Sequence, residues 1–210
     1  NYSLEIGMDY PGFTSDMLML LQDAKDTLEA TKFAVGAGDG STEPFGIVTA
    51  LAGGSSEINV AGSEGVFAAV DLYAMEEALG PRFRPNASFV ANKAIYNKVR
   101  QFDTAGGAGL WERIGAGMPS QLLGYNAYEA SAMDGAWDVA ATANNYIAVL
   151  GDFRNYVIAD RIGMSVETIQ HVVDGDGKLT GQRGLLAWWR VGGDSVNDAA
   201  FTLLDNPTAA

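Results

Sequence analysis

The chain has 210 residues, of which 48% are hydrophobic, and this is enough to build the core of one globular domain or of two interlocked ones. Its 13 basic and 26 acidic residues give a formal charge of −13, which excludes a surface that binds nucleic acid or an anionic membrane over most of its area. No cysteine is present, so disulfide bonds, thiolate metal sites and cysteine nucleophiles are excluded.

The first predicted elements are a short strand and a long helix. Residues 1–6 alternate weakly between polar and apolar side chains, which favours a strand that ends before Pro11. The helix is expected over residues 15–32, with Ser15 or Asp16 as its N-cap. Its apolar residues recur three and four positions apart and are expected to share one buried face: Met17, Leu20, Leu21, Ala24 and Leu28.

A glycine-rich loop follows this helix, over Gly36 to Gly40 and on to Gly46. It invites comparison with a phosphate-binding loop, which ends in Gly-Lys-Ser or Gly-Lys-Thr so that the lysine and the hydroxyl reach phosphate and magnesium. The chain's single Gly-Lys pair, Gly177-Lys178, is followed by leucine. The sequence therefore predicts a structural turn here and no nucleotide cofactor.

The middle of the chain predicts two helices and a strand between them. The first helix is expected from Ser63 to Gly80-Pro81, where glycine and proline stop it. A strand is expected over residues 88–91, and Asn92 is a suitable N-cap for the second helix. The residues expected on the buried faces are Phe67, Val70, Ala74 and Ala78 in the first helix, and Ile95, Val99 and Phe102 in the second.

Extended structure dominates the second half. Strands are predicted at about residues 122–130, 146–150, 156–173 and 184–191, with turns at 151–152 and 174–177. Helices and strands are segregated rather than alternating, which predicts an α+β fold and disfavours a doubly wound nucleotide-binding sheet. The longest apolar stretch, 139–151, is shorter than the roughly 20 residues that a membrane-spanning helix needs, so no membrane partner is expected.

Three groups of polar residues are candidates for catalytic or metal sites. The segment from Asp174 to Lys178 resembles a calcium loop, but its fifth, sixth and twelfth positions are Lys178, Leu179 and Leu185 instead of an oxygen ligand, glycine and glutamate. It therefore predicts a hairpin turn. His171, the one histidine, is followed by two valines, which favours a packed position in a strand.

Carboxylate pairs for hydrolysis could be drawn from the acidic residues of the second half: Asp134, Asp138, Asp194 and Asp198. With 26 acidic residues in the chain, such pairs arise by chance. No nucleophile motif such as Gly-x-Ser-x-Gly accompanies them. The residues therefore predict no catalytic site, no metal site and no cofactor.

The sequence Trp188-Trp189-Arg190 favours an interface. Adjacent residues of a strand face opposite sides of the sheet, so both sides must accept an indole ring. One ring is expected in the core. Because aromatic residues and arginine are enriched at protein interfaces, the other ring and Arg190 are candidates for contact with a second subunit, with an intrachain role as the alternative.

The order of several segments resembles the major capsid proteins of tailed bacteriophages, which have the Hong Kong 97-type fold, over nearly the whole chain. The segments that carry this resemblance are the helix 15–32 with the Gly-rich, Pro-x-Gly-Ile turn 38–47, Phe89-Val90-Ala91-Asn92, Leu122-Leu123-Gly124, Val149-Leu150-Gly151-Asp152-Phe153, and Arg190-Val191-Gly192 before 198–201. Each piece alone is unspecific, but five in the right order are hard to obtain by chance.

The resemblance implies two domains. A peripheral domain would comprise residues 1–50 and 151–192, with a long spine helix and long strands, and an axial domain would comprise residues 51–150 and 193–210. The loop 115–120 would lie near the capsomer axis, which makes three of its residues further subunit-contact candidates: Gly117, Met118 and Pro119. Family members carry an N-terminal arm and an extended loop before the spine helix. This chain starts where that hairpin should end, so both elements are expected to be absent from it. Because the chain begins at Asn1 rather than methionine, upstream sequence is expected to have been removed.

The function that the resemblance implies is that of a structural shell subunit and not an enzyme. Its partners would be copies of itself in pentamers and hexamers, together with portal, scaffold or decoration proteins. Packaged double-stranded DNA would be enclosed without sequence-specific binding, which agrees with the acidic composition. Its location would be the virion, and the host cytoplasm during assembly.

Three alternatives remain open from the sequence. An encapsulin-like nanocompartment shell would have the same fold and would contain cargo enzymes instead of DNA. An acidic hydrolase would use the paired carboxylates and would need a cleft that gathers them. A small-ligand binding module would need a large apolar pocket with converging polar groups.

Overall fold

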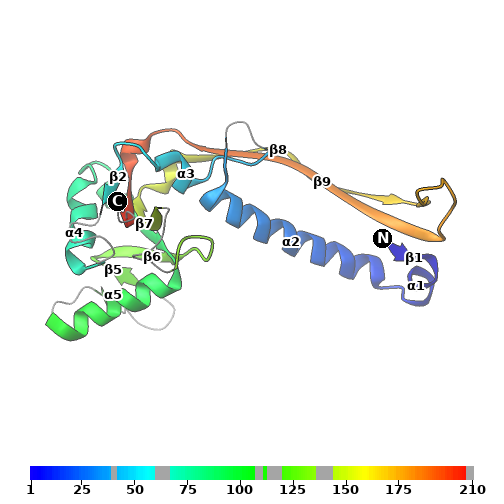
Figure 1. The fold of residues 1–210 in the computed structure, drawn as a ribbon, viewed down its shortest axis with the longest axis horizontal. Helices are drawn as coiled ribbons and strands as arrows, with labels where there is room; N and C mark the ends of the chain where they lie inside the picture. Colours follow the sequence, from blue (N-terminus) through cyan, green and yellow to red (C-terminus); the bar gives the residue numbers. More distant parts are fainter. Residues whose placement is uncertain (39–41, 60–66, 107–110, 113–119, 136–143, 207–210) are drawn as a thin grey trace. The chain divides into compact units, whose positions relative to one another are not determined.

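A computed structural model describes residues 1–38, 42–59, 67–106, 111–112, 120–135 and 144–206, and Figure 1 shows its elements. The helices are α1 (Leu4–Asp9), α2 (Phe13–Val35), α3 (Ile47–Leu51), α4 (Ala69–Ala78) and α5 (Lys93–Gly106), with 3-10 turns η1 (Arg84–Asn86), η2 (Phe153–Asn155) and η3 (Asp198–Ala200). The strands are β1 (Tyr2–Ser3), β2 (Glu57–Asn59), β3 (Ser88–Ala91), β4 (Trp111–Glu112), β5 (Gln121–Leu122), β6 (Tyr125–Glu129), β7 (Asn145–Gly151), β8 (Tyr156–Ile169), β9 (Gln182–Ser195) and β10 (Phe201–Asn206).

The chain forms two compact units. The first comprises residues 1–29 and 159–192, and the second comprises residues 30–158 and 193–210. Helix α2 and the long strands β8 and β9 contribute residues to both units. Each unit therefore consists of segments that are far apart in the sequence.

The first unit contains a three-stranded sheet in the order β1-β9-β8. Strand β1 pairs antiparallel with β9, with Tyr2 opposite Arg183. The predicted strand over residues 1–6 is wrong beyond Ser3, because the Ser3 side chain accepts a hydrogen bond from the backbone N–H of Glu5 at 3.3 Å and thereby caps α1.

Helix α2 is longer than predicted and uses a different face. It begins at Phe13, since the carbonyl oxygen of Gly12 already accepts from the backbone N–H of Asp16 at 3.1 Å. Leu20 and Leu28, which were expected on the buried face, are 58% and 45% exposed. Within the first unit the half-buried positions of α2 are Asp16 and a series four residues apart: Phe13, Met17, Leu21, Lys25 and Glu29.

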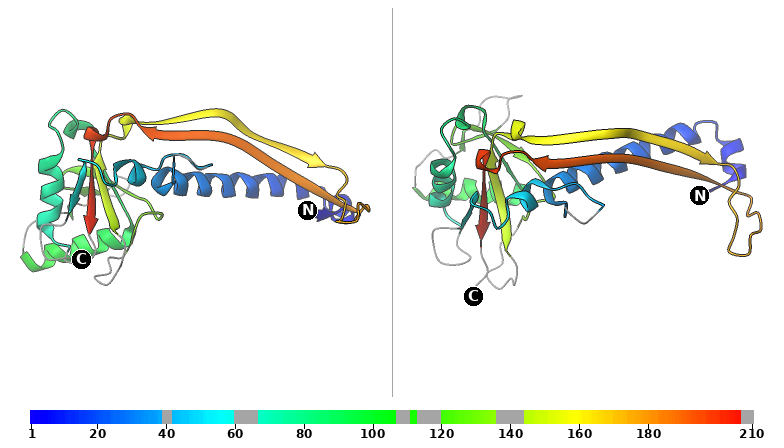
Figure 2. Two further views of the ribbon diagram at one scale, coloured as in Figure 1. Left: turned by 45° about the horizontal axis from the view of Figure 1, so that its top comes forward. Right: turned by 90° about the horizontal axis from the view of Figure 1, so that it is seen from above.

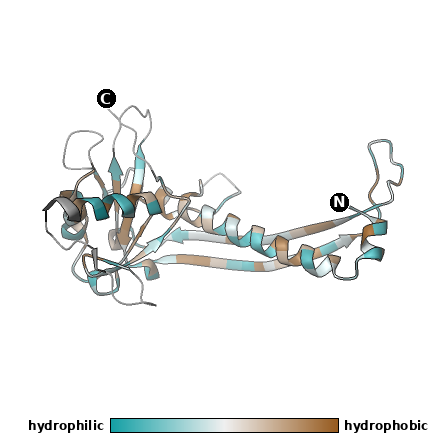
Figure 3. Ribbon diagram, turned by 90° about the horizontal axis from the view of Figure 1, so that it is seen from below, coloured by the Kyte–Doolittle hydropathy of each residue, from teal (hydrophilic) through white to brown (hydrophobic). Residues whose placement is uncertain are grey.

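The first unit has no hydrophobic core of its own. Every residue of 1–29 and 159–192 is described, and none of them is a buried hydrophobic residue. All the buried hydrophobic side chains belong to the second unit. Figure 3, coloured by hydropathy, shows apolar stretches along α2 and along the two long strands. Apolar surface in the first unit is therefore left without full cover.

The second unit is built on a seven-stranded mixed sheet in the order β2-β10-β7-β3-β6-β5-β4. Strand β10 lies between β2, to which it is parallel, and β7, to which it is antiparallel. The two views of Figure 2 show β7 and β10 side by side in this sheet, with α4 and α5 in the same unit. The C-terminal strand is thus central to the core.

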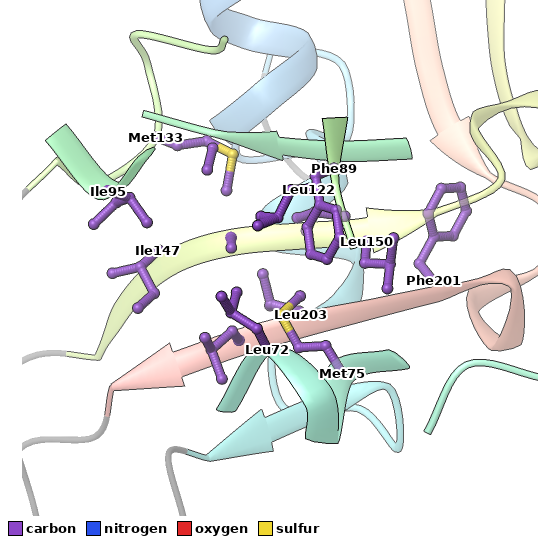
Figure 4. Packing of buried hydrophobic residues seen from close by; sticks show 14 of the residues in the cluster. Leu72, Met75, Phe89, Ile95, Leu122, Met133, Ile147, Leu150, Phe201 and Leu203 are labelled. Atoms are coloured by element: carbon purple, nitrogen blue, oxygen red, sulfur yellow. The ribbon is translucent and has the colours of Figure 1, made fainter. Parts of the chain in front are cut away.

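Figure 4 shows how α4, α5 and the sheet fill this core. Leu72 and Met75 of α4 are buried against Leu203 of β10, and Ile95 of α5 and Leu150 of β7 belong to the same cluster. Full burial of a leucine or methionine side chain stabilises a fold by about 1.5–3 kcal/mol. This cluster is therefore the main source of stability in the second unit.

Phe67, expected on the buried face of this helix, is buried just before α4 begins, but the predicted face within α4 itself is wrong. Val70 is 55% exposed, and the residues that α4 buries are Asp71, Leu72 and Met75. Asp71 is buried because its carboxylate accepts a hydrogen bond from the backbone N–H of Ala68 at 2.7 Å and so satisfies the start of the helix. Residues 60–66, where the helix was expected to begin, lie outside the described residues.

The predicted strand over residues 122–130 is two strands joined by a tight turn. Leu123 and Gly124 have φ angles of 52° and 78° and connect β5 to β6. Positive φ at both central residues matches the twist of a hairpin. The pairing was not predicted because a leucine, rather than asparagine or aspartate, occupies the first of these positions.

The remaining predicted elements agree well with the structure. Strand β3 has the predicted bounds, and the Asn92 side chain caps α5 by accepting from the backbone N–H of Ala94 at 3.0 Å. Strands β7 and β9 contain the strands predicted there. Strand β8 ends at Ile169, four positions before the predicted end at Val173.

Candidate assembly surfaces

The glycine-rich loop after α2 is a tightly packed turn. A Cβ atom at Gly36 would overlap the carbonyl oxygens of Lys32 and Pro44, and the backbone N–H of Gly46 donates to the carbonyl oxygen of Gly36 at 3.0 Å. The Lys32 ammonium lies 2.6 Å from a carboxylate oxygen of Glu43 and lowers the pKa of that carboxyl. The described part of this loop thus serves backbone packing. Residues 39–41 lie outside the described residues.

Tyr156 fixes this turn to the long strands within the second unit. Its hydroxyl donates to the carbonyl oxygen of Phe45 at 2.7 Å, and the backbone N–H of Phe45 donates to the carbonyl oxygen of Gly193 at 2.9 Å. The Tyr156 ring contacts the Phe33 ring of α2 edge-on, with 6.3 Å between the ring centroids. Burial raises the pKa of Tyr156 to about 12, so the hydroxyl remains a donor at neutral pH.

The calcium-like segment is a hairpin turn. One carboxylate oxygen of Asp174 accepts from the backbone N–H groups of Asp176 and Lys178 at 3.0 and 2.8 Å, and Gly177 has a φ angle of 78°. The Asp174 carboxylate is therefore used inside the turn. His171 is exposed and lies beyond the end of β8, so its predicted place in a strand is wrong.

The three described aspartates among the four considered for hydrolysis have separate roles. Asp134 and Asp194 accept from the backbone N–H groups of Tyr146 and Ser195 at 3.0 and 2.8 Å, and Asp198 is exposed in η3. Asp138 lies outside the described residues. Within the described ranges, no group of three histidine or acidic side chains is arranged to hold a metal ion. No helix there is long and apolar enough to cross a membrane.

A buried acidic residue was missed from the sequence. Asp205 of β10 is 1% exposed and lies near Glu57 of β2 and Asp134. Burial, followed by the charge of Glu57, raises the pKa of Asp205 to about 6. The sequence carries no signal for this cluster, because its members come from three segments that only the folded sheet brings together.

Trp188 and Trp189 occupy opposite sides of β9. Trp188 is 41% exposed, and Leu186 and Arg190, two positions away on either side, are exposed as well. Trp189 is half-buried. In the described part of the chain Arg190 makes no ion pair. The other three contact candidates, Gly117, Met118 and Pro119, lie outside the described residues.

The N-terminal helices expose further apolar side chains that were not predicted as surface. Met8 of α1 and Met19 of α2 are 67% and 65% exposed. Met19 lies outside the apolar face that was predicted for α2. An apolar residue outside that face was the sequence signal for exposed apolar surface on this helix. Large exposed apolar patches on soluble proteins mark interaction sites. The exposed apolar side chains of the first unit thus favour binding to another protein surface.

Comparison with known proteins gives consistent results. A model of the phage capsid family matches residues 19–206. The chain is similar to the capsid of an empty GTA particle, with a TM-score of 0.79 and 30% sequence identity over 100% of this chain and 71% of that one. The capsid of a native GTA particle gives a TM-score of 0.77 at 30% identity, over 100% and 70% of the two chains.

A more distant likeness is to an encapsulin. The holo-SrpI encapsulin complex from Synechococcus elongatus PCC 7942 gives a TM-score of 0.67 at 12% identity, over 99% of this chain and 73% of that one. Identity at this level shows a shared fold and nothing further. No match was found among curated proteins.

Proposed function

The chain belongs to the phage capsid family and is a structural shell subunit of the Hong Kong 97-type fold, and from this premise we propose that it is the major capsid protein of a virion. Copies of it assemble into pentamers and hexamers that close an icosahedral shell. The observation that carries the proposal is the 30% identity to a particle capsid over the full length of the chain. Because this match covers the whole chain, it includes both compact units.

The domain assignment belongs to this proposal. Residues 1–50 and 151–192 form the peripheral domain, with α2 as the spine helix, and residues 51–150 and 193–210 form the axial domain. The loop 115–120 lies near the capsomer axis. Trp188, Trp189 and Arg190 contribute to contacts between subunits. The exposure of Trp188 and Arg190 on one side of β9 supports this role.

The proposed contents of the shell are double-stranded DNA. A formal charge of −13 disfavours tight binding of phosphate, so the DNA is enclosed without sequence-specific contacts. Portal, scaffold and decoration proteins are the further partners. Assembly takes place in the host cytoplasm, and the finished protein resides in the virion. The role proposed for the subunit is structural rather than catalytic.

A nanocompartment shell of the encapsulin type is the second candidate. The likeness to the encapsulin from Synechococcus elongatus favours it only at the level of fold, because the identity is 12% against 30% for the GTA particle capsid. The two candidates differ in the contents of the particle: an encapsulin-type shell would enclose proteins, and a virion would enclose DNA.

The experiment that tests this function is analysis of particles released from cells that carry the gene. Particles are purified by density gradient, treated with nuclease, and analysed for protein by mass spectrometry and for protected DNA. We expect peptides of this chain to dominate particles that hold nuclease-resistant DNA. Particles of this chain that contain only proteins would support the nanocompartment instead, and absence of the chain from any particle would contradict both.

A further inference from the structure

The first unit presents two faces that a single chain leaves uncovered. Residues 1–29 and 159–192 contain no buried hydrophobic residue, although they include a helix and two long strands. A sheet or helix that keeps apolar side chains at its surface is completed by another layer. Another surface must therefore supply that layer.

The first of these faces belongs to β9. Leu186 and Trp188 are 48% and 41% exposed, and Arg190 is exposed at the next alternate position. The intervening residues, Ala187 and Trp189, are half-buried. Because side chains alternate along a strand, these three exposed residues form one row, which we call the outer face of β9. It combines apolar area with a positive charge at one end.

The second face belongs to α2. Met19, Asp23 and Asp26 are separated by four and three residues and so share one side of the helix, which we call the outer face of α2. All three are exposed, Met19 by 65%. The half-buried residues Met17, Leu21 and Lys25 lie on the opposite side. This face combines apolar area with negative charge.

The two faces match in spacing and in charge. Residues two apart on a strand are separated by about 6.6 Å, and residues four apart on a helix by about 6 Å along its axis. Trp188 and Arg190 can therefore lie opposite Met19 and Asp23 at the same time. A thioether against an aromatic ring and an arginine beside a carboxylate are both favourable contacts.

Two charges of the first unit have no ion-pair partner among the described residues of one chain. Lys25 pairs with Glu29 at 2.8 Å and lies 4.0 Å from the carboxylate of Asp26, so Asp23 is the carboxylate of the outer face of α2 that is left for a second subunit. Among the described residues, neither Arg190 nor Asp23 makes an ion pair. Both faces are exposed in the single chain, so neither covers the other there. A second copy of the chain offers each face its complement.

Resting on the proposed shell function, we propose that the outer face of β9 in one subunit docks on the outer face of α2 in a second copy, with Trp188 against Met19 and Arg190 paired with Asp23. The contact is heterologous, since each copy offers a different face to each neighbour. Repetition of such a contact about an axis closes a ring, as a pentamer or hexamer requires.

A charge exchange tests the contact in the full-length protein. Arg190→Glu is expected to raise the protein concentration needed for assembly about tenfold or more, because it places two negative charges together at the contact. Adding Asp23→Arg to Arg190→Glu is expected to restore assembly to within about threefold of the wild-type concentration. Lys178→Glu is the matched control, because it reverses the charge in the same way at an exposed residue of the hairpin tip.

The outcomes separate the contact from the shell function. Wild-type chain that forms shells while Arg190→Glu assembles equally well would overturn the docking and leave the shell function standing. A double variant no better than Arg190→Glu would overturn the pairing with Asp23. Wild-type chain that stays monomeric would overturn the shell function and the docking together. Circular dichroism of each variant shows whether a loss of assembly reflects misfolding, and the milder Arg190→Gln replaces any variant that misfolds.

Discussion

At the scale of single residues, Asp205 is the clearest case of a side chain whose properties depend on its surroundings. It is 1% exposed near Glu57 and Asp134, and burial raises its pKa to about 6. A raised pKa in the folded state means that the folded chain binds a proton more tightly than the unfolded chain. The resulting stabilisation is complete below the unfolded pKa and is lost as the pH rises through about 6.

The first prediction follows from this sign. Asp205→Asn removes the charge that the core must otherwise hold at neutral pH, so we expect the variant to be more stable than wild type by about 1–2 kcal/mol at pH 7.5 and no more stable at about pH 3.5, below the unfolded pKa. Urea denaturation at the two pH values measures the difference. Asp23→Asn, at an exposed position, is the control and should change stability equally little at both. An equal effect of Asp205→Asn at both values would contradict the raised pKa.

Tyr156 gives a second prediction at this scale. Tyr156→Phe keeps the ring and removes the hydroxyl that donates to the carbonyl oxygen of Phe45, so we expect a loss of about 1 kcal/mol in the free energy of unfolding. Urea denaturation of the variant measures the loss. Tyr128→Phe is the matched control, since Tyr128 is 51% exposed and should tolerate the change. If both variants lost the same free energy of unfolding, the hydrogen bond from Tyr156 to Phe45 would not contribute to stability.

What could be predicted at this scale depended on sequence distance. The Asn92 cap and the alternation of Trp188 and Trp189 were predictable, because each depends only on adjacent residues. The bond from Tyr156 to Phe45 joins residues 111 positions apart, and the Asp205 cluster joins three separate segments. Neither pattern is visible before the chain is folded.

At the scale of elements, the turn after α2 depends on glycine for close approach. A Cβ atom at Gly46 would overlap the backbone of Gly36 and lie close to the backbone of Ala34 and Val35. We expect Gly46→Ala to destabilise the chain by about 2–4 kcal/mol, since backbone atoms cannot move aside as a flexible side chain can. Thermal unfolding monitored by circular dichroism measures this loss.

The control for this prediction is Gly80→Ala. A Cβ atom there would meet only the Phe83 ring at an ordinary contact distance of 3.5 Å, so the change should stay within about 0.5 kcal/mol. If Gly46→Ala were as mild as Gly80→Ala, the turn would tolerate a rearrangement that the structure does not allow.

Element type was predicted better than element detail. The long helix, the helix that Asn92 caps and the long strands were all predicted, because their periodicity extends over many residues. The buried face of α4 was wrong, since Asp71 is buried there to cap the helix start and shifts the apolar side to Leu72 and Met75. The hairpin at Leu123 was missed because turn residues with positive φ are rarely leucine.

At the scale of the whole molecule, stability is unevenly distributed. The second unit holds all the buried hydrophobic side chains, and the first unit holds none. Regions with few buried apolar contacts open at a lower free energy than the core. We therefore expect backbone amides of residues 1–29 and 159–192 to exchange with deuterium faster than those of β7 and β10 in the unassembled chain.

Assembly should reduce the difference in exchange rate between the first unit and strands β7 and β10. Hydrogen exchange read by mass spectrometry compares the unassembled chain with closed shells, and β7 and β10 provide the internal control because they are protected in both. We expect slower exchange of the first unit in the shells, since neighbouring copies then cover it. Equal exchange of the two units in the unassembled chain would contradict the assignment of all buried hydrophobic packing to the second unit.

At this scale the sequence predicted the family and the α+β class correctly, through the order of short segments rather than through any one of them. It did not predict that the buried packing lies in one unit alone. That property depends on which face of α2 and of the long strands turns inward, and Leu20 and Leu28 illustrate how periodicity alone assigned it wrongly.

Electron microscopy with mass determination of the full-length protein shows directly whether this chain is a shell subunit. We expect closed shells or ring-shaped capsomers whose mass is a multiple of the subunit mass. A protein that remains monomeric at every concentration tested would contradict this expectation.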